Sequence, residues 1–377
     1  MEMQNQVILG LGSNQGNRLA TIQLAIESIH NEVGTVVNVS KLYETPAWGF
    51  ESTSFYNCVL LINTSLCASV ILDKVLNLEK KLGRVRSNSN GYQSRIIDID
   101  VIAFNEDVLI TKDLKVPHPL MQDRLFVLLP MQDLGLKWNH PILQKQIPEL
   151  IKESKDKSIC KVIQELQFPL QKIHLQKFNY IAIEGNIGAG KTSLVNKIAQ
   201  DFNAKTILER YADNPFLPEF YEDQNRYAFS LEMSFLADRF QQISDDLSQL
   251  DLFKDFVLAD YHVFKSLIFA KVTLSEEEYR LYKKLFDIIY KEMPKPDLYV
   301  YLYQNTDRLL ENIRQRGRYY EQEIPAAYLE KINSGYLEYI KSQKGLNVVI
   351  IDISDKDFVS NHLDYISVLN EISDKII

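Results

Sequence analysis

The chain has 377 residues, of which 46% are hydrophobic and 24% are charged, which is enough apolar material for the cores of two globular domains. Its net charge of −8 argues against long nucleic acid as a partner, and the lack of an apolar run of about 18 residues argues against a membrane span. Three cysteines without metal-binding or disulfide spacing, and an N-terminus unlike a signal peptide, predict a cytoplasmic protein.

The first half of the chain predicts the element order β-α-β-β-α-β, which is typical of an α+β sandwich of the ferredoxin-like type. Apolar runs predict the strands, and apolar residues at helical spacing predict the helices. The expected strands cover residues 7–11, 33–43, 55–63 and 96–104, and the expected helices cover residues 18–30 and 68–82. A further short helix is expected after this unit, over residues 147–153. The charged stretch 152–161 predicts a solvated tail or linker. We place the first domain over residues 1–172 and the second over residues 173–377.

Two aspartates stand out on the strand expected over residues 96–104. Alternation along a strand places Asp98 and Asp100 on one face and the apolar residues beside them on the other. Carboxylates on one strand face are costly unless water or a metal ion satisfies them, so the pair is a candidate Mg²⁺ site, with a hydrated edge strand as the alternative. Arg84 and Arg95 lie close by in the sequence, and arginines suit a polyphosphate substrate.

Seven motifs of the first half resemble hydroxymethyl-dihydropterin pyrophosphokinase, an enzyme family of folate biosynthesis. They are Gly12-Ser13-Asn14, Thr45-Pro46, Phe55-Tyr56-Asn57, Gly83-Arg84-Val85-Arg86, Arg95-x-x-Asp98-x-Asp100, Val116-Pro117-His118-Pro119 and Arg124-x-Phe126, in family order. The resemblance implies transfer of pyrophosphate from ATP to 6-hydroxymethyl-7,8-dihydropterin. The loop over 87–94 departs from the family, because Tyr92 replaces a tryptophan and an arginine is missing near Gly91, which implies a weaker grip on ATP.

The same resemblance implies roles for individual residues. Asp98 and Asp100 would bind Mg²⁺ ions that bridge ATP and the pterin. The charge that develops during transfer would be neutralised by Arg84 and Arg95, and the ATP phosphates would be contacted by His118. The pterin ring would lie between the side chains of Phe55 and Phe126, with core packing as the alternative for each. Its polar edge would be bound by the Asn57 amide and the Thr45 backbone.

The second half begins with a strand, a loop and a helix around residues 184–194, EGNIGAGKTSL. The loop fits the pattern G-x-x-x-x-G-K-[ST] of phosphate-binding loops, in which Lys191 supplies positive charge and the Thr192 hydroxyl ligates Mg²⁺. A glycine-rich turn without a ligand is the alternative. We expect the ATP phosphates to be held by Gly185, Asn186, Gly188, Ala189, Gly190, Lys191 and Thr192.

Five apolar runs alternate with helical patterns in this half and predict an α/β fold with a five-stranded parallel sheet. The runs cover residues 180–184, 205–209, 256–260, 298–303 and 348–352. Ligands bind at the carboxyl ends of such strands, and Glu184, Glu209 and Asp260 lie at three of these ends. Each is a candidate base or Mg²⁺ ligand, and helix capping is the alternative for a single acid.

Further motifs make the second half similar to the deoxyribonucleoside kinase family over about residues 180–340. They are Leu208-Glu209-Arg210, Asn214-Pro215, Phe220-Tyr221-Glu222, Arg226-Tyr227-Ala228-Phe229, Asp238-Arg239-Phe240 and the basic lid RGRYYEQEIP from Arg316. The resemblance implies 5′-phosphorylation of deoxynucleosides by ATP. Glu209 would be the base, and Asp260 would hold Mg²⁺ with Thr192. The remaining implied contacts are Arg316 and Arg318 on the γ-phosphate, Tyr221 and Glu321 on the 3′-hydroxyl, and Phe229, Glu232 and Arg239 at the base.

Two departures from this family affect the expected site. Tyr261 stands where relatives have an arginine, with Lys265 or Arg239 as candidate replacements. Glu232 stands where relatives generally have glutamine, and a carboxylate favours a base edge rich in donors, such as guanine, or adenine if it is protonated. This indicates a purine.

We therefore expect a bifunctional, ATP- and Mg²⁺-dependent transferase that serves folate biosynthesis and deoxynucleoside salvage. One alternative is that one half is a degenerate, ligand-binding regulator of the other. A second is that the rear half is a nucleoside monophosphate kinase, for which Arg210 is the one obvious acceptor-phosphate arginine near Glu209. The long helix expected over 226–250 either buries a face in a homodimer or packs on its own sheet.

Overall fold

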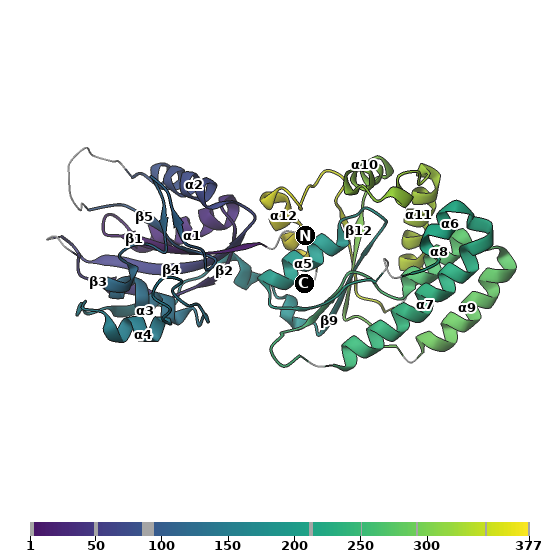
Figure 1. The fold of residues 1–377 in the computed structure, drawn as a ribbon, viewed down its shortest axis with the longest axis horizontal. Helices are drawn as coiled ribbons and strands as arrows, with labels where there is room; N and C mark the ends of the chain where they lie inside the picture. The colour runs from purple at the N-terminus through teal and green to yellow at the C-terminus, as the bar shows by residue number, and fades with distance from the viewer. Residues whose placement is uncertain are drawn as a thin grey trace. The chain divides into compact units, whose positions relative to one another are not determined.

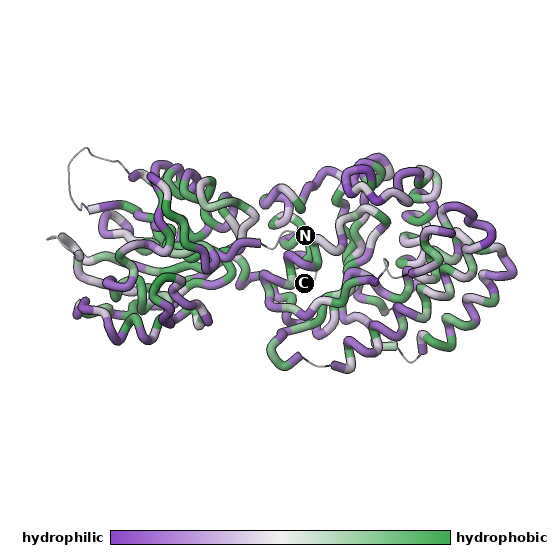
Figure 2. The backbone as a smooth tube through the Cα atoms, viewed as in Figure 1, coloured by the Kyte–Doolittle hydropathy of each residue, from purple (hydrophilic) through white to green (hydrophobic). Residues whose placement is uncertain are grey.

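The computed structural model describes residues 4–48, 52–84, 94–210, 214–249, 251–291, 293–343 and 345–375. The chain divides into two compact units, Met1–Ile173 and His174–Ile377, each with its own sheet (Figure 1). The strands of both sheets are mainly hydrophobic, whereas hydrophobic and hydrophilic residues alternate along the helices (Figure 2). Within these residues no helix is both long and apolar enough to cross a membrane.

The N-terminal unit is built on an antiparallel sheet with the order β5-β1-β4-β3-β8, in which β2 also pairs with β4. The strands are β1 (Asn5–Ser13), β2 (Thr35–Val39), β3 (Leu42–Thr45), β4 (Phe55–Thr64), β5 (Asp98–Phe104) and β8 (Lys161–Gln164). The short hairpin of β6 (Leu109–Ile110) and β7 (Lys115–Val116) follows β5. Ser13, Phe55 and Asp98 lie at the ends of β1, β4 and β5, and these three strand ends are neighbours at the same end of the sheet.

Helices cover both faces of this sheet because its strands alternate between two apolar sides. On one face, α1 (Arg18–Glu32) and α2 (Ala68–Lys81) pack on Leu9 and on the other strand side chains that point to the same side of the sheet. On the other face, α3 (Leu125–Asp133) and α4 (Ile147–Glu153) pack on Ile8 and the residues that alternate with the first set. Ile99 and Val101 point into the first core, which leaves Asp98 and Asp100 on the opposite face of β5.

Two features of this unit differ from expectation, and a third, the helix α3, was not predicted. The strand expected over 33–43 is two strands, β2 and β3. Between them, Ser40 Oγ accepts a hydrogen bond from the Val59 amide at 2.9 Å, which interrupts the regular pairing. The charged stretch 152–161 leads into β8, which pairs with β3. The apolar run 125–133 forms α3 although it contains Pro130, and its spacing gives no amphipathic signal because apolar residues surround the helix.

The C-terminal unit is a parallel sheet with the order β10-β11-β9-β12-β13. The strands are β9 (Tyr180–Gly185), β10 (Lys205–Ile207), β11 (Val257–Ala259), β12 (Leu298–Tyr303) and β13 (Val348–Asp352), which confirms the expected five-stranded sheet. The next two strands, β10 and β11, lie on one side of β9, and β12 and β13 lie on the other. The carboxyl end of β9 is therefore the switch point where such sheets bind ligands.

Long helices cover this sheet. The helices are α5 (Lys191–Asp201), α6 (Leu217–Glu222), α7 (Gln224–Ser248), α8 (Phe264–Thr273), α9 (Glu276–Tyr290), α10 (Thr306–Arg316), α11 (Ala326–Ser342) and α12 (His362–Asp374). One apolar core joins β9 and β12 to α7, α8, α9 and α11. Leu236 and Ile243 place one face of α7 in this core, so α7 packs within its own unit, and a second subunit stays a prediction.

We expect burial on α1 to dominate the stability of the N-terminal unit. Replacing Ile26, which is 0% exposed, with alanine should lower the free energy of unfolding by about 2–5 kcal/mol, because the cavity cannot collapse fully. The control Leu24→Ala, at a site 51% exposed, should change it by less than about 0.5 kcal/mol. Tryptophan fluorescence isolates this unit, since both tryptophans of the chain, Trp48 and Trp138, lie in it. Equal losses in the two variants would contradict the assignment of the core.

Candidate active sites

An aromatic cavity opens in the N-terminal unit where β1, β4 and β5 end. It encloses about 710 Å³, including the part open to solvent. Its lining includes the four residues expected around the pterin together with both aspartates: Thr45, Phe55, Asn57, Phe126, Asp98 and Asp100. Asn57 Nδ2 donates to Thr45 Oγ1 at 2.7 Å. A Cβ at Gly12 would lie 2.9 Å from Asn57 Oδ1, so glycine at that position leaves room for the amide.

A second, basic cavity meets the first at the aspartates. The two cavities share three residues, Arg95, Asp98 and Asp100. The second is lined by further cationic or basic groups, namely Arg84, Lys112, Lys115 and His118. The carboxylates of β5 therefore stand between a space suited to a flat ring and a space suited to phosphates.

Asp98 is held by two arginines. Arg84 Nη1 donates to Asp98 Oδ1 at 2.5 Å, and Arg95 Nη1 donates to Oδ2. Arg84 also donates to Glu79 on α2, a residue that is 1% exposed and that accepts from the Ile99 amide at 2.9 Å. Glu79 thus ties α2, Arg84 and β5 together, and sequence reasoning missed it because one glutamate on an amphipathic helix gives no signal.

Two further groups that line these cavities, Asp100 and His118, have shifted pKa values. Burial raises the pKa of Asp100 to about 7, and repulsion from Asp98 adds to the shift. Burial, then the charge of Arg124, lowers the pKa of His118 to about 4, so this imidazole is neutral near pH 7. Its Nδ1 accepts from the Leu120 amide at 3.2 Å, which assigns the proton to Nε2. His118 can therefore donate a hydrogen bond to an anion without carrying charge.

Two residues of the aromatic cavity received no role in the sequence analysis. The Arg124 guanidinium lies 4.9 Å from the ring centroid of Trp48 and 5.6 Å from that of Phe126. The signal that could have found Arg124 is its place two residues before Phe126. The departures at Gly91 and Tyr92 lie outside the described residues.

In the C-terminal unit the phosphate-binding loop follows β9. Gly188 and Gly190 have φ angles of +86° and +76°, which favour glycine, and α5 starts at Lys191 with its positive end at the loop. Lys191 Nζ donates to the carbonyls of Gly185 and Asn186, each at 2.9 Å.

A cavity lies beside this loop. Of the seven residues expected around the phosphates, three line it: Gly188, Lys191 and Thr192. Gly185, Ala189 and Gly190 are absent from that lining, as is Asn186. The Asn186 side chain instead donates to the Leu329 carbonyl and to Asn333 Oδ1, so it fixes the loop to α11.

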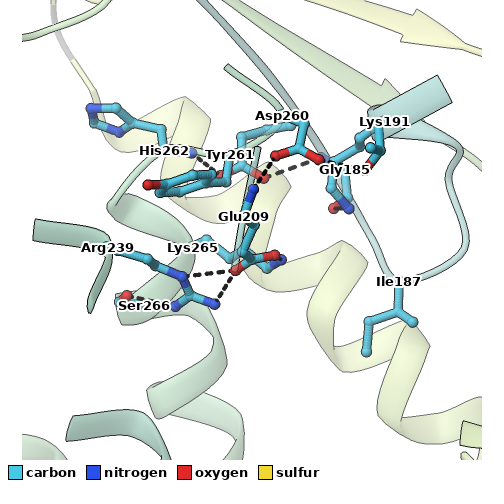
Figure 3. A network of polar contacts seen from close by, with 12 residues as sticks. Gly185, Ile187, Lys191, Glu209, Arg239, Asp260, Tyr261, His262, Lys265 and Ser266 are labelled. Atoms are coloured by element: carbon cyan, nitrogen blue, oxygen red, sulfur yellow. Dashed lines mark hydrogen bonds and ion pairs between the residues drawn. The ribbon is translucent and has the colours of Figure 1, made fainter. Parts of the chain in front are cut away.

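The Asp260 carboxylate links the end of its own strand to the neighbouring strand end and to this loop (Figure 3). Thr192 Oγ1 bonds to Asp260 Oδ2, and the Glu209 amide donates to Asp260 Oδ1 at 2.8 Å. Glu184, the third acid expected there, is turned into the core, where it accepts from the His262 amide at 2.7 Å and the Tyr336 hydroxyl at 2.9 Å. Its strand-end position therefore does not bring its carboxylate into the cavity.

Glu209 lies between two cations. Arg239 donates to Oε1 from Nε at 2.9 Å and from Nη2 at 2.6 Å, and Lys265 Nζ donates to Oε2 at 2.6 Å. Burial alone would raise the pKa of Glu209, but Lys265 and then Arg239 outweigh it and hold the pKa well below its usual value. Both candidate replacements for the missing arginine thus contact the carboxylate, while the Tyr261 hydroxyl bonds to Gln242 at 3.0 Å.

The far end of the cavity is apolar and contains one buried acid. Its walls are Leu217, Phe220, Leu231, Phe235, Phe269 and Tyr328. Phe229, expected to line this space, is absent from the lining, since Phe220, Phe235 and Phe269 form its aromatic surfaces. Glu232 is 2% exposed and lines the cavity; Oε1 accepts from Thr273 at 3.0 Å, and Oε2 has no hydrogen-bond partner within the described parts of the chain.

The basic lid reaches the same cavity. Arg316 and Arg318 both bond to Glu321, which is 5% exposed, and the Arg318 contact is 3.1 Å long. These three residues line the cavity together with Tyr221, whose ring stacks on Tyr320 at a centroid distance of 5.7 Å. A bend at Gly317, with φ +74°, separates the two arginines.

Comparison with known proteins assigns each half to a family. Residues 181–377 match the deoxynucleoside kinase family, and residues 8–135 match the 7,8-dihydro-6-hydroxymethylpterin-pyrophosphokinase family. A deoxyguanosine kinase of Bacillus subtilis is 37% identical over 202 residues, covering 52% of this chain and 98% of the relative. A deoxyadenosine/deoxycytidine kinase of the same organism is 28% identical over 207 residues, covering 54% and 95%.

The first half has its own relative. A 2-amino-4-hydroxy-6-hydroxymethyldihydropteridine pyrophosphokinase of Aquifex aeolicus is 39% identical over 158 residues, covering 42% of this chain and 97% of the relative. Each half thus spans nearly the whole length of a separate enzyme. The chain belongs to both families and is a fused enzyme, a hydroxymethyl-dihydropterin pyrophosphokinase followed by a deoxynucleoside kinase.

Proposed function

We propose that the N-terminal unit joins its two substrates at Asp98 and Asp100. The observation that carries this proposal is that both aspartates line the aromatic cavity and the basic cavity alike. Phe55 and Phe126 would take the two faces of the pterin ring, since flat heteroaromatic rings favour stacking. The polar edge of the ring would meet Asn57 and Thr45.

On the basic side, Arg84, Arg95 and His118 would take the ATP phosphates. The pterin hydroxymethyl oxygen then attacks the β-phosphorus, the bond from that phosphorus to the α-phosphate oxygen breaks, and AMP leaves. Both arginines contact Asp98, which supports a position for them beside the proposed reacting centre. Fixed positive charge of this kind stabilises a transition state without reorganisation at the moment of reaction.

We further propose Mg²⁺ at both sites. Mg²⁺ prefers oxygen ligands and commonly takes one or two carboxylates together with water and substrate phosphates. Asp98 and Asp100 on one strand face fit this requirement, as do the linked carboxylate and hydroxyl of Asp260 and Thr192. When bound, the ion neutralises charge on the phosphate oxygens. The described residues contain no cluster of three or more candidate side-chain ligands, in line with a cation that takes its other ligands from ATP and water.

In the C-terminal unit, Glu209 is the proposed base that accepts the proton of the deoxynucleoside 5′-hydroxyl. Arg316 and Arg318 would contact the γ-phosphate, and Tyr221 and Glu321 would bind the 3′-hydroxyl; all four line the cavity that also contains Glu209. The alternative of a nucleoside monophosphate kinase lacks support, because Arg210, its one candidate for an acceptor phosphate, is exposed and absent from the lining.

A purine base fits the far end of this cavity best. Aromatic walls suit a flat base, and Glu232 offers a buried oxygen that has no partner in the described parts of the chain. Leaving such an oxygen unsatisfied costs about 1–3 kcal/mol, which a ligand N–H recovers. Guanine presents two neighbouring donors to a carboxylate, and adenine presents a donor and an acceptor to a carboxylic acid. The curated relatives include a deoxyguanosine kinase, which supports this assignment.

For the N-terminal unit we propose membership of the ferredoxin-like fold class. The strand order β5-β1-β4-β2 and the antiparallel pairing support it, as do the two helices α1 and α2 on one face.

Replacing Asp98 with asparagine should lower pyrophosphoryl transfer at least about 100-fold, because it removes an Mg²⁺ ligand and the group that positions Arg84 and Arg95. Transfer is followed as label passing from β-labelled ATP to the pterin. The same molecule should phosphorylate a deoxynucleoside from γ-labelled ATP at an unchanged rate, and the exposed Asp107→Asn control should keep both activities. Loss of both activities in Asp98→Asn would argue against independent sites.

Glu209→Gln should give the reverse pattern. Deoxynucleoside phosphorylation should fall about 100- to 10,000-fold, because the amide cannot accept the hydroxyl proton. Pyrophosphoryl transfer by the same molecule serves as the control for folding and should not change. A variant that keeps its deoxynucleoside kinase activity would remove Glu209 from the role of base.

The choice between purines should depend on pH. Burial raises the pKa of Glu232 to about 7, while Arg239, the Thr273 hydroxyl and Lys265 act to lower it, and Glu209 to raise it. Below pH 7 the neutral acid prevails and favours adenine; above pH 7 the carboxylate prevails and favours guanine. The ratio of kcat/KM for deoxyguanosine to that for deoxyadenosine should therefore rise by up to about tenfold per pH unit.

The ratio cancels groups that titrate for both substrates, Tyr282 and Tyr328 near Glu232 included. In Glu232→Gln it should stay constant with pH. Deoxyinosine, which lacks the 2-amino group but keeps N1–H, should follow deoxyguanosine with lower efficiency. A constant ratio in the unmodified enzyme would contradict the assignment of Glu232 to the base.

A further inference from the structure

Lys265 is a buried cation that the proposed roles leave unexplained. It lies in the first turn of α8, is 7% exposed and lines the kinase cavity. Its Nζ donates to Glu209 Oε2 at 2.6 Å and lies 5.4 Å from the ring centroid of Phe269. An ammonium group carries three donors, and within the described residues this one hydrogen bond uses only the first of them.

The other cation at Glu209, Arg239, is held in place at all three of its nitrogens. Arg239 uses Nε and Nη2 on Glu209 Oε1, and Nη1 donates to Ser266 Oγ at 2.7 Å. A planar guanidinium held at three nitrogens cannot follow a moving ligand. Arg239 keeps two N–H donors, but their directions are fixed by these three contacts, so of the two cations Lys265 is the one whose remaining donors can turn toward a moving group.

Lys265 also faces the phosphate-binding loop. Its charge and that of Lys191 repel each other, and both side chains line the same cavity. Glu209, Asp260 and Glu184 offset part of this repulsion, and phosphate oxygens lying between the two ammonium groups would offset more of it. In the proposed mechanism the acceptor hydroxyl binds at Glu209, and the outer phosphates of ATP bind at Lys191. The transferred phosphoryl group therefore crosses the space between these two residues.

We propose that Lys265 is a catalytic residue whose ammonium group contacts the phosphoryl group during its transfer from ATP to the deoxynucleoside. The inference rests on the proposed role of Glu209. The 5′-oxygen forms a bond to the γ-phosphorus as its proton passes to Glu209. The bond from the γ-phosphorus to the bridging oxygen breaks, and ADP leaves with that electron pair. Lys265 keeps the carboxylate in place and offers its remaining donors to the oxygens of the moving group.

Lys265 supplies this charge from a helix because the strand end beside it cannot. Tyr261, next to Asp260 at the end of β11, is 0% exposed and bonds through its hydroxyl to Gln242. Lysine suits the task because a compact charge on a flexible stem can keep contact with the phosphoryl oxygens as they move.

The first test compares three variants in the full chain. Lys265→Met should lower kcat for deoxynucleoside phosphorylation about 100- to 1,000-fold, the usual effect of removing one group that stabilises developing charge. KM for ATP and for the deoxynucleoside should change much less, and Lys265→Arg should recover at least about tenfold over Lys265→Met. Lys271→Met, an exposed site on the same helix that pairs with Glu338 at 2.9 Å, should behave like the unmodified enzyme.

Pyrophosphoryl transfer, measured in each variant, reports whether the chain is intact. A Lys265→Met enzyme with kcat within about threefold of the unmodified value, or one that loses pyrophosphoryl transfer as well, would overturn the proposal.

The second test separates contact with the phosphoryl group from an effect through Glu209 alone. In a double-mutant cycle, adding Lys265→Met to Glu209→Gln should lower kcat at least about tenfold further if Lys265 touches substrate. No further loss would mean that Lys265 acts only by holding the carboxylate, and would overturn the proposal. If Glu209→Gln alone had the unmodified kcat, the proposed base would be wrong, a result distinct from either outcome above.

Discussion

A carboxylate clamped between two cations occurs in each half of this enzyme, and both sites depend on it. Asp98 is held by Arg84 and Arg95, and Glu209 by Arg239 and Lys265. A buried carboxylate without such partners would be protonated, and buried cations without a carboxylate would repel each other. The two cations keep Glu209 charged, and in both halves the clamp collects positive charge where phosphate oxygens would arrive. Each site is thus organised for a polyanion before one binds.

The two folds reach this arrangement by different routes. In the N-terminal unit, strand alternation puts Asp98 on the face of β5 opposite the apolar core, and Arg84 follows α2, where Glu79 anchors it. In the C-terminal unit, Glu209 and Asp260 follow adjacent parallel strands, so the sheet order itself brings them together. The cations on Glu209 come from α7 and α8, which pack on that sheet.

Much of this could be predicted from the sequence, and the reasons for the exceptions are physical. The five strands of the second unit followed from apolar runs, and the alternation around Asp98 followed from the period of a strand. Position at a strand end could not tell that Glu184 turns into the core, because the direction of its side chain depends on Tyr336 and the His262 amide, which are distant in sequence. Glu79 was invisible for a similar reason, since its partners lie beyond its own helix.

Local patterns were weakest where tertiary contacts decide. The strand β8 lies in a charged region and forms because β3 offers it a free edge. The aromatic walls of the kinase cavity come from α6, α7, α8 and α11. The family resemblance pointed to Phe229, whereas Phe220, Phe235 and Phe269 line the space.

The central claim is that one chain carries two separate sites for Mg²⁺ and ATP. Equilibrium binding of an ATP analogue whose phosphate bridges cannot be cleaved, measured on the full chain with Mg²⁺, tests it most directly. The account predicts that two analogue molecules bind per chain. A deoxynucleoside triphosphate that competes for the kinase cavity should displace one of them and leave the other bound. Binding of a single molecule per chain, or of none, would contradict the account.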